Sequence, residues 1–525
     1  MAGPSTATKE VHIVGTSDQV ADRAPEPWLT KVALSFDGGG VRGYWSLLVL
    51  QHLMQSIQGF EREHDASTMS SFHPCEKPDN VTQLLDSNNL QNRAAYTPFL
   101  PCHYFDYICG TSTGALIAIL LSRFRMTVED CLKEYETMAG AIFGKPRRFH
   151  KMNVLVGWNK YSRKTLKKAC EEVIERRSQM DEGDKETLFQ TEIDTCRGAV
   201  LATRLHDGRT VTKRFLFRSY TPYSERRRQH AQGGGDIYMR NPNQGMKIPL
   251  LKVALAGTAA PFYFGHYHTV LSTSEAQAAK RAETNRTVFT RTTSGWTRRQ
   301  DKLPEGRSQY TFQDGGFSSA NNPCREIYNE IRYHHGDNIT PVLVSIGTAR
   351  AKDEFVGEGA RTNIKRGLHH LGNPEEIHET LEADKDNGNL SYYRLNNEDG
   401  ISIEMDEWKP KKEGGKTIQK MTAEFHSWLR KDGVENRFRE CARHLVQLRR
   451  ARMGTLRWER FALGQYFVCQ VQNCPKDRDN QWLDRDGFRD HLRREHRTED
   501  YGGNIDGALD TCRRTWRYRS RAASS

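Results

Sequence analysis

The segment Gly110-Thr111-Ser112-Thr113-Gly114 decides the fold, because it follows a short apolar stretch at 105–109 and precedes the uninterrupted apolar run 115–121. This order predicts a buried strand, a sharp turn and a helix. In such a turn the central residue adopts a strained backbone conformation, and small neighbours avoid a clash. The Ser112 hydroxyl would then project from the carboxyl edge of a sheet, beside the N-terminus of the helix. We predict Ser112 as a nucleophile; the alternative is a glycine turn that only packs the helix against the sheet.

A second turn, Asp37-Gly38-Gly39-Gly40-Val41-Arg42-Gly43, follows the predicted strand 31–36 and precedes the predicted helix 44–57. Its glycines match the dinucleotide-binding pattern G-x-G-x-x-G, which also needs an acid about 20 residues further on, after a second strand. Glu61 and Glu63 are at that distance, but no strand-like run precedes them. Consecutive glycines also let backbone N–H groups converge on a small anion, such as the oxyanion of acyl transfer. We therefore favour an oxyanion site over a nucleotide site.

A serine nucleophile needs a base, and the sequence offers two kinds. A Ser-His-Asp triad would place its histidine late in the chain, for example at His369 or His370. Asp314-Gly315-Gly316 follows the alternating apolar stretch 310–313 and so ends a predicted strand. Aspartate is the weaker base, but burial in an apolar pocket raises its pKa. The alternative for Asp314 is an ordinary hairpin turn.

Strands and helices alternate along the chain. Further apolar stretches predict strands at 199–203, 215–219 and 341–346 and helices at 164–177 and 250–256. This alternation predicts an α/β fold with a mainly parallel sheet in a three-layer α/β/α arrangement. Composition divides the chain into a flexible tail at 1–29, a catalytic core at 30–350, a helical extension at 351–460, a small distinct module at 465–500 and a basic tail at 501–525.

Together, the glycine motifs at 37–43, 110–114 and 314–316 resemble those of the patatin-like phospholipases, which are lipid acyl hydrolases. The resemblance covers about residues 31–450, because further stretches at 254–264, 342–348 and 405–408 match segments of that family. It implies a patatin-like hydrolase with a Ser112–Asp314 dyad and no histidine. It also implies an oxyanion hole formed by the backbone of Gly38, Gly39, Gly40, Arg42 and Gly43, to which the Thr113 N–H would add.

The resemblance implies a reaction of the calcium-independent phospholipase A2 or lysophospholipase type. Ser112 would attack an acyl ester of a membrane lipid and form an acyl-enzyme, with no cofactor for catalysis. Arg42 is a candidate to bind an anionic headgroup, but we favour an ion pair that supports the glycine segment 37–43. The spacer 43–110 is longer than usual for the family, and 221–245 and 270–309 look inserted. The alternative function is a regulatory or sensor protein that uses the hydrolase fold to bind a lipid or a partner.

Near the C-terminus, Cys469-x4-Cys474-x16-His491-x4-His496 has the ligand types and outer spacings of a two-cysteine, two-histidine zinc finger. Trp482, Phe488 and Leu492 stand where such a finger keeps its apolar core. We predict a structural Zn²⁺ bound by Cys469, Cys474, His491 and His496. The alternative is a set of unconnected cysteines and histidines in a charged tail. The combination of hydrolase and finger resembles the filamentous-fungal members of the family.

The predicted finger is poorly suited to nucleic acid. The helix that would enter a DNA groove opens with Asp484, Asp486 and Asp490, which repel phosphates. A single finger also reads only about three base pairs. We expect a structural role or a protein partner for the finger instead.

Charge and apolar content indicate where the chain works. The formal net charge is +12, and half of this excess lies at 437–460, where eight arginines accompany two glutamates. Such a strip is either a solvated helix face or a surface that docks on an anionic membrane. The longest apolar run has seven residues, against roughly 20 for a membrane span, and no secretory signal is visible. With an odd count of eleven cysteines, we expect reduced thiols in a cytoplasmic protein that associates peripherally with membranes.

Overall fold

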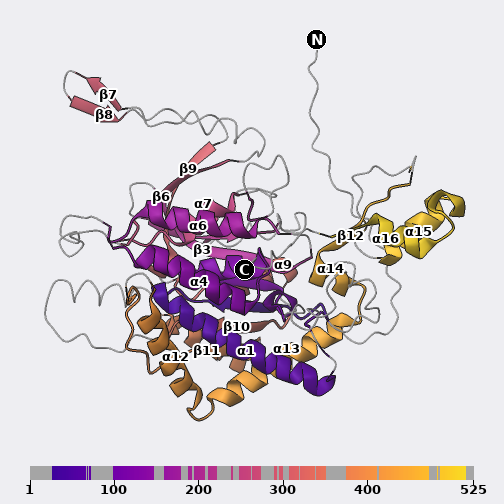
Figure 1. Cartoon of the computed structure of the whole chain (residues 1–525), viewed down its shortest axis with the longest axis horizontal. Helices are drawn as coiled ribbons and strands as arrows, with labels where there is room; N and C mark the ends of the chain where they lie inside the picture. The colour runs from indigo at the N-terminus through magenta and orange to yellow at the C-terminus, as the bar shows by residue number, and fades with distance from the viewer. Residues whose placement is uncertain are drawn as a thin grey trace.

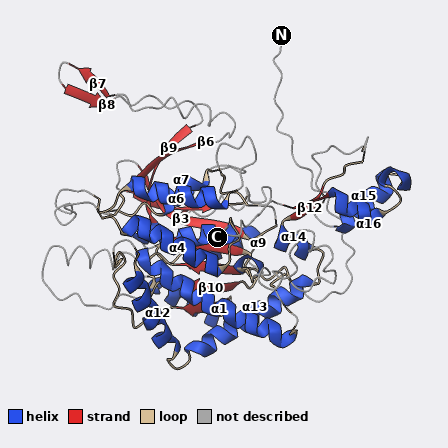
Figure 2. Cartoon of the chain, viewed as in Figure 1, coloured by secondary structure: helices blue, strands red, loops and turns tan. Residues whose placement is uncertain are grey.

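In the computed structural model, helices cover both faces of a central sheet, and a small module lies to one side (Figure 1). Figure 2 shows the strands between the helices. The structure describes residues 26–66, 68, 70–72, 99–146, 159–178, 187–191, 194–206, 211–220, 238–240, 248–261, 263–272, 289–292, 295–298, 307–317, 320–336, 339–349, 374–388, 390–410, 413–471, 474, 482 and 485–515.

Short buried strands form the centre of a nine-stranded sheet. The order is β11 (Ser391–Leu395), β10 (Val342–Ile346), β1 (Val32–Phe36), β2 (Tyr107–Thr111), β3 (Arg197–His206), β4 (Val211–Arg218) and β5 (Tyr238–Arg240); β9 (Arg307–Asp314) also pairs with β3, and β6 (Tyr267–Ser272) pairs with β9. Within the described residues, five of its eight strand pairings are parallel. All residues of β1, β2 and β10 are buried, as in parallel sheets covered on both faces. The predicted mixed α/β fold with a mostly parallel sheet is therefore confirmed.

The strands β2 and β9 meet end to end along β3. β2 runs parallel to β3 and ends with Thr111 opposite Leu201. β9 approaches from the other direction, antiparallel to β3, and ends with Asp314 opposite Ala202. Because β2 leads directly into Ser112, this pairing brings residues 112 and 314 to one point at the edge of the sheet.

Helices form a layer on each face of the sheet. One face carries α1 (Gly43–His64), α3 (Thr113–Ser122), α4 (Val128–Phe143), α6 (Arg163–Arg177) and α7 (Leu250–Gly257); the other carries α9 (Cys324–His335) and α11 (Glu375–Asp386). Along β1, Val32 and Leu34 join the core under α1 and α3, whereas Ala33 joins the core under α9. Both faces of the strand are apolar for this reason.

The predicted helical extension also contributes to the central fold. β11 adds a strand beside β10, and α12 (Gly415–Leu429) and α13 (Val434–Met453) pack along α1. Trp45 of α1 contacts the rings of Phe425 and Trp428, with centroid distances of 5.4 Å and 5.6 Å. The described residues on either side of position 350 therefore share one sheet and one core.

The arginine-rich segment 437–460, for which the sequence left a solvated helix face and a membrane-docking surface open, is largely paired within the protein. Five of its eight arginines pair with three carboxylates: Arg449 and Arg450 with Glu61, Arg452 with Asp106, and Arg457 and Arg460 with Asp194. Arg449 and Arg452 are only 1% exposed. These five side chains are held by acids of the protein itself, and three carboxylates offset only part of their charge. The partners are distant in sequence, which is why counting charges along the segment missed them.

A small module follows α14 (Arg457–Leu463). It contains β12 (Gln465–Phe467), α15 (Arg485–Glu495), α16 (Ile505–Cys512) and β13 (Arg513–Thr515), and β13 pairs antiparallel with β12. Leu509 and Cys512 of α16 are buried in the same cluster as Phe488 of α15. Residues 505–515 were predicted to belong to a basic tail, but they form part of this module, which extends beyond residue 500.

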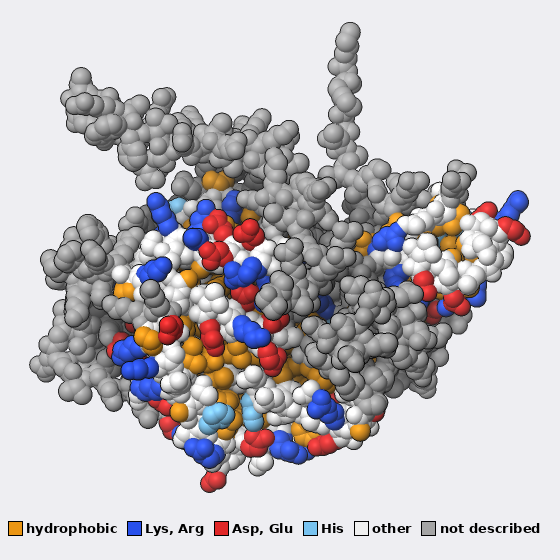
Figure 3. Space-filling model, viewed as in Figure 1, with side chains coloured by type: hydrophobic (Ala, Val, Ile, Leu, Met, Phe, Trp, Pro, Cys, Tyr) orange, Lys and Arg blue, Asp and Glu red, His pale blue; other side chains and the backbone are white. Residues whose placement is uncertain are grey.

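The remaining described features concern the surface and the insertions. β7 (Phe289–Thr292) and β8 (Gly295–Arg298), inside the predicted insertion 270–309, form a separate two-stranded sheet. None of the described helices combines the length and apolar content that a membrane span requires. On the face in Figure 3, basic and acidic side chains of the described residues are interspersed, not separated by sign.

Trp28, predicted to lie in a flexible tail, is buried against Trp458 and Phe461.

Candidate active site and candidate metal centre

Ser112 occupies the turn between β2 and α3. Its backbone angles, φ 55° and ψ −124°, are rare for a residue with a side chain, in agreement with the strained turn predicted from the sequence. Glycines on both sides make this turn possible. A Cβ on Gly110 would lie 1.9 Å from the carbonyl oxygen of Gly114, and a Cβ on Gly114 would lie 2.4 Å from that of Phe36. The turn thus holds Ser112 at the carboxyl edge of the sheet.

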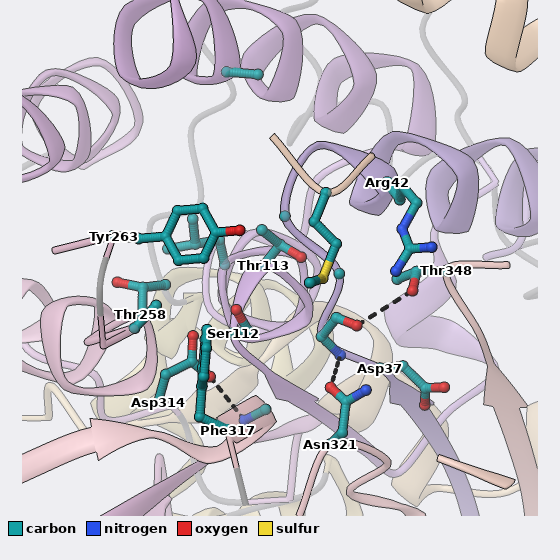
Figure 4. Close-up of a pocket in the computed structure, with 18 of the residues that line it drawn as sticks. Asp37, Arg42, Ser112, Thr113, Thr258, Tyr263, Asp314, Phe317, Asn321 and Thr348 are labelled. Atoms are coloured by element: carbon teal, nitrogen blue, oxygen red, sulfur yellow. Dashed lines mark hydrogen bonds between the residues drawn. The ribbon is translucent and has the colours of Figure 1, made fainter. Parts of the chain in front are cut away.

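Asp314 ends β9 beside Ser112 (Figure 4). The carboxyl group is fully buried, and its Oδ1 accepts a hydrogen bond from the Gly316 N–H at 2.8 Å. Its Oδ2 has no hydrogen-bond partner among the described residues. Burial raises the pKa of Asp314 to about 7, against smaller lowering effects of the neighbouring Ser112 hydroxyl and the Gly316 N–H. A carboxyl group with this pKa and an open acceptor oxygen can take up a proton near neutral pH.

The glycine segment divides into occupied and unoccupied N–H groups. Gly38 donates to Asn321 Oδ1 at 3.0 Å, and the N–H groups of Arg42 and Gly43 are used inside the turn, by the carbonyls of Gly39 and Gly40. Within the described part of the chain, the N–H groups of Gly39 and Gly40 have no partner. Of the five predicted oxyanion-hole residues in this segment, these two have N–H groups available in this conformation.

The N–H of Thr113 is also available. Thr113 is the first residue of α3, and the first N–H groups of a helix have no acceptor within the helix. The positive end of the helix dipole adds to the attraction for a negative charge at this position.

Arg42 is buried, and none of the described residues forms an ion pair with it. Its Nε and Nη1 have no hydrogen-bond partner among the described residues, and no carboxylate in that part of the chain lies within 4.0 Å of its guanidinium. Burial lowers the pKa of Arg42 to about 10, while Tyr263 and Glu404 act in the opposite direction. The ion pair that we expected to support the glycine segment is therefore absent from the described residues.

A cavity opens at Ser112 and Asp314 (Figure 4). One wall is apolar and comes from α3, α4 and α6, with Leu116, Ile142 and Leu166 among its side chains. The glycine segment 37–43, with Arg42, also lines the cavity. No histidine occurs among the described residues that line this cavity. The alternative bases His369 and His370 lie outside the described residues.

Several side chains that position the glycine segment were not predicted from the sequence. Asn321 binds the Gly38 N–H, Thr348 donates to the Gly38 carbonyl at 3.2 Å, and Tyr135 donates to the Gly40 carbonyl at 2.5 Å. Arg394 pairs with Asp37 at 2.7 Å, yet burial still raises the pKa of Asp37 to about 6. Thr348 lies in the stretch 342–348 that resembles the family, which was the one available signal. The other contacts join distant parts of the chain.

Comparison with known families accounts for this arrangement. Residues 34–328, more than half of the chain, match the family model described as patatin-like phospholipase. The chain belongs to the patatin-like phospholipase family. The matched range begins in β1 and ends in α9, so it includes the glycine segment, Ser112 and Asp314. The family predicted from the three glycine motifs is confirmed.

Individual relatives of this patatin-like chain are distant. It is 24% identical to "Calcium-independent phospholipase A2-gamma" from Mus musculus, over 72% of this chain and 36% of that protein. The protein of the same name from Homo sapiens is also 24% identical, over 67% of this chain and 33% of that protein. The chain spans about a third of the length of these curated relatives. Among solved structures, VipD from Legionella pneumophila covers 81% of this chain and 67% of its own, with 11% identity and a TM-score of 0.23, too low to support a structural argument.

In the C-terminal module, the four predicted zinc ligands come together. The Sγ atoms of Cys469 and Cys474 and ring nitrogens of His491 and His496 all lie within 4.8 Å of one another. The Cys469 Sγ lies 3.3 Å from His496 Nε2, and the Cys474 Sγ lies 3.6 Å from His491 Nε2. A tetrahedral zinc ion with ordinary Zn–S and Zn–N bonds separates such atoms by about 3.6 Å. The donor set and its spacing fit a zinc ion.

Proposed function

We propose that the chain is a lipid acyl hydrolase that uses Ser112 as nucleophile and Asp314 as general base. One observation carries the proposal. The strained turn at Ser112 adjoins a fully buried carboxyl group whose Oδ2 is unpartnered among the described residues and whose pKa is raised to about 7. Membership of the patatin-like phospholipase family and the absence of histidine among the described cavity-lining residues support the dyad over a triad.

The proposed reaction proceeds in two steps. Ser112 Oγ attacks the ester carbonyl while its proton passes to Asp314 Oδ2, and the resulting oxyanion accepts hydrogen bonds from the N–H groups of Gly39, Gly40 and Thr113. The ester bond then breaks, and the proton on Asp314 passes to the departing alcohol. In the second step, water gives its proton to Asp314 and attacks the acyl-enzyme, which releases the fatty acid and returns the proton to Ser112.

We propose membrane lipids as the substrates. The apolar side chains from α3, α4 and α6 suit an acyl chain, and the buried guanidinium of Arg42, which also lines the cavity, suits an anionic headgroup. The names of the relatives support a calcium-independent phospholipase A2 type of reaction, with no cofactor in catalysis. We place this activity in the cytoplasm, with peripheral association to membranes.

A fluorescent acyl ester assay tests the proposal. We expect wild-type turnover and its loss, by about 10³-fold or more, in Ser112→Ala and Asp314→Asn, with circular dichroism unchanged. Ser56→Ala is the matched control, because among the described residues that hydroxyl bonds only to the carbonyl of His52 within α1. Equal turnover by wild type and Ser112→Ala would favour the alternative function, a regulatory or sensor protein that binds lipid without cleaving it.

We propose that Cys469, Cys474, His491 and His496 hold one structural Zn²⁺, as in the fungal family members that the sequence resembles. The spacing of their donor atoms supports this assignment. Metal analysis of the purified full chain should give about one zinc per chain. Cys474→Ser should lower this content, whereas Cys512→Ala, in the same module but outside the four ligands, should retain it. Equal zinc content in both variants would reject the site.

The C-terminal module, which contains β12, α15, α16 and β13, provides a candidate surface for a protein partner. Asp486 and Asp490 are not buried, and Asp486 pairs with Arg489 of the same helix at 2.6 Å. We propose a protein partner over nucleic acid because Asp486 and Asp490 lie in the first half of the helix that would enter a DNA groove, where acids oppose phosphates.

A further inference from the structure

A second cavity lies at the opposite end of the sheet from Ser112. Lys31, which precedes β1, and Arg197, which begins β3, line this cavity of about 320 Å³ together with Arg457 of α14. Asp37 follows the same strand β1 at its other end. Six residue steps at about 3.3 Å each place the two cavities about 20 Å apart along the strand. This cavity is therefore separate from the candidate active site.

Two cations of this cavity have no carboxylate partner in the described part of the chain. Lys31 is only 6% exposed, and its ammonium group donates to the carbonyl of Trp28. The guanidinium of Arg197 lies over the ring of Tyr107, 5.1 Å from its centroid, and donates to the Tyr107 hydroxyl at 2.5 Å. Within the described residues no carboxylate lies within 4.0 Å of either group, and the charge of Asp106 only partly offsets the effect of burial on Lys31. A buried ammonium group without a counter-charge is costly, and burial lowers the pKa of Lys31 to about 8.

The acids nearest to this cavity are already paired. Asp194 is shared by Arg457 and Arg460, both at 3.3 Å. Asp106 pairs with Arg452 at 2.7 Å and also accepts the Val32 N–H. Both acids also act on the cations of the cavity, Asp106 on Lys31 and Asp194 on Arg197, but these two carboxylates face five cations: Lys31, Arg197, Arg452, Arg457 and Arg460. The cavity therefore keeps a surplus of positive charge.

The ring of His335 adds no charge to this cavity. His335 Nε2 lies 2.9 Å from the Tyr107 hydroxyl, and burial lowers the pKa of His335 to about 3, so its ring is neutral at pH 7. His334 contacts Glu330, which also pairs with Arg218. The cavity is thus lined by three cations and one shared carboxylate, with the neutral ring of His335 beside them.

We propose that this cavity, lined by Lys31, Arg197 and Arg457, binds a small soluble phosphate-bearing anion. Guanidinium groups bind phosphate oxygens through paired N–H donors, and the ammonium of Lys31 adds a point charge with further donors. The surplus positive charge disfavours a metal cation, and the charged lining disfavours an apolar ligand. The anion would complete the counter-charge that Asp106 and Asp194 supply only in part. This proposal does not depend on the proposed acyl hydrolase function.

Thermal unfolding of the full chain at pH 7 tests the proposal, with sodium phosphate compared with sodium chloride at equal ionic strength. An anion that binds only the folded state raises the melting temperature. We expect phosphate to stabilise the wild type and to lose most of this effect in Lys31→Met and Arg457→Met. Calorimetry should show phosphate affinity reduced about tenfold or more in both variants. If Lys31→Met fails to fold, Arg457→Met still tests the site. We expect this variant to fold, because the Arg457 side chain is 34% exposed and Asp194 remains paired with Arg460.

Two further variants locate the bound phosphate. Arg437→Met changes an exposed arginine of α13 and should respond to phosphate like the wild type. Arg42→Met should also keep the response, because Arg42 lines the other cavity. A response that disappears in Arg42→Met and persists in Arg457→Met would assign phosphate to the active site and overturn the proposal. Binding to phosphatidic acid vesicles without any response to inorganic phosphate would overturn it as well, in favour of a membrane headgroup.

Discussion

The two ends of the central strands carry opposite kinds of buried charge. At the carboxyl end, Asp37 and Asp314 are buried carboxyl groups whose pKa values are raised to about 6 and about 7. At the amino end, Lys31 is a buried ammonium group whose pKa is lowered to about 8. The five residues of β1 between Lys31 and Asp37 are all buried and almost entirely apolar. The strand therefore separates two environments. At its carboxyl end the buried carboxyl groups bind protons more readily than usual, and at its amino end the buried ammonium group loses its proton more readily than usual.

This difference indicates how one fold supports two sites. The interior of a parallel sheet has to be apolar on both faces, so polar chemistry concentrates where strands end. Each end buries a charged group at a cost in stability. At the carboxyl end this group is a carboxylate that can accept a proton, and at the amino end it is an ammonium group that an anion can neutralise. Stability should therefore respond to pH with opposite signs at the two ends, which gives the comparison measurable consequences.

The largest effect on activity should come from a steric clash introduced at Gly40, at the carboxyl end of the strands. Gly40 has φ +60°, and a Cβ there would lie 1.9 Å from the carbonyl oxygen of Met405. Gly40→Ala should shift the glycine segment and misplace its N–H groups, with kcat/KM on an acyl ester reduced about 10²-fold or more. Gly59→Ala in α1 is the control, since its Cβ would meet nothing within 4 Å. A Gly40→Ala variant with wild-type kcat/KM would remove this segment from the oxyanion site.

The next effect is the pH dependence of activity at the same end. Asp314 has to be deprotonated to act as a base, and its pKa is about 7. We expect kcat/KM to fall about tenfold per pH unit below 7. The fall should steepen below about 6, where Asp37 takes up a proton and weakens its ion pair with Arg394. A flat profile from pH 8 to pH 5, measured on a soluble ester with the Ser112→Ala rate subtracted, would be incompatible with Asp314 as the base.

How far the sequence could predict these features depends on the range of the contacts. Ser112 and Asp314 were found because each follows an apolar strand and carries glycines beside it, which are local signals. Asn321 and Arg394, which support the glycine segment from distant positions, carry no local signal. Arg449 was predicted to be part of a surface strip, because a charge count along α13 does not reveal its buried partner Glu61. The spacing of the glycine motifs predicted the family, whereas the pairing of charges required the fold.

A smaller effect concerns stability at the carboxyl end. The pKa of Asp314 is raised on folding from 3.8 to about 7, so the folded state binds this proton more tightly than the unfolded state. The wild type should lose this stability as pH rises from about 4 to about 7. Asp314→Asn resembles the protonated form and should be more stable than wild type at pH 8, by about 2 kcal/mol, with the difference vanishing near pH 4. Denaturant unfolding at both pH values measures this, with Asp432→Asn, at an exposed position, as the control.

The smallest effect should appear at the amino end, with the opposite sign. The pKa of Lys31 is lowered on folding from 10.5 to about 8, so the unfolded state binds this proton more tightly. Wild-type stability at this site should therefore rise as pH increases from about 8 to about 10. Lys31→Met removes the buried charge together with its bond to Trp28, and it should be more stable than wild type at pH 7 in chloride by about 1 kcal/mol. Added phosphate should reverse this order, because only the wild type keeps the ammonium group that the anion neutralises. If the methionine variant is instead less stable in chloride, the Trp28 carbonyl already compensates the Lys31 charge, and the contrast between the two ends of the strand is lost.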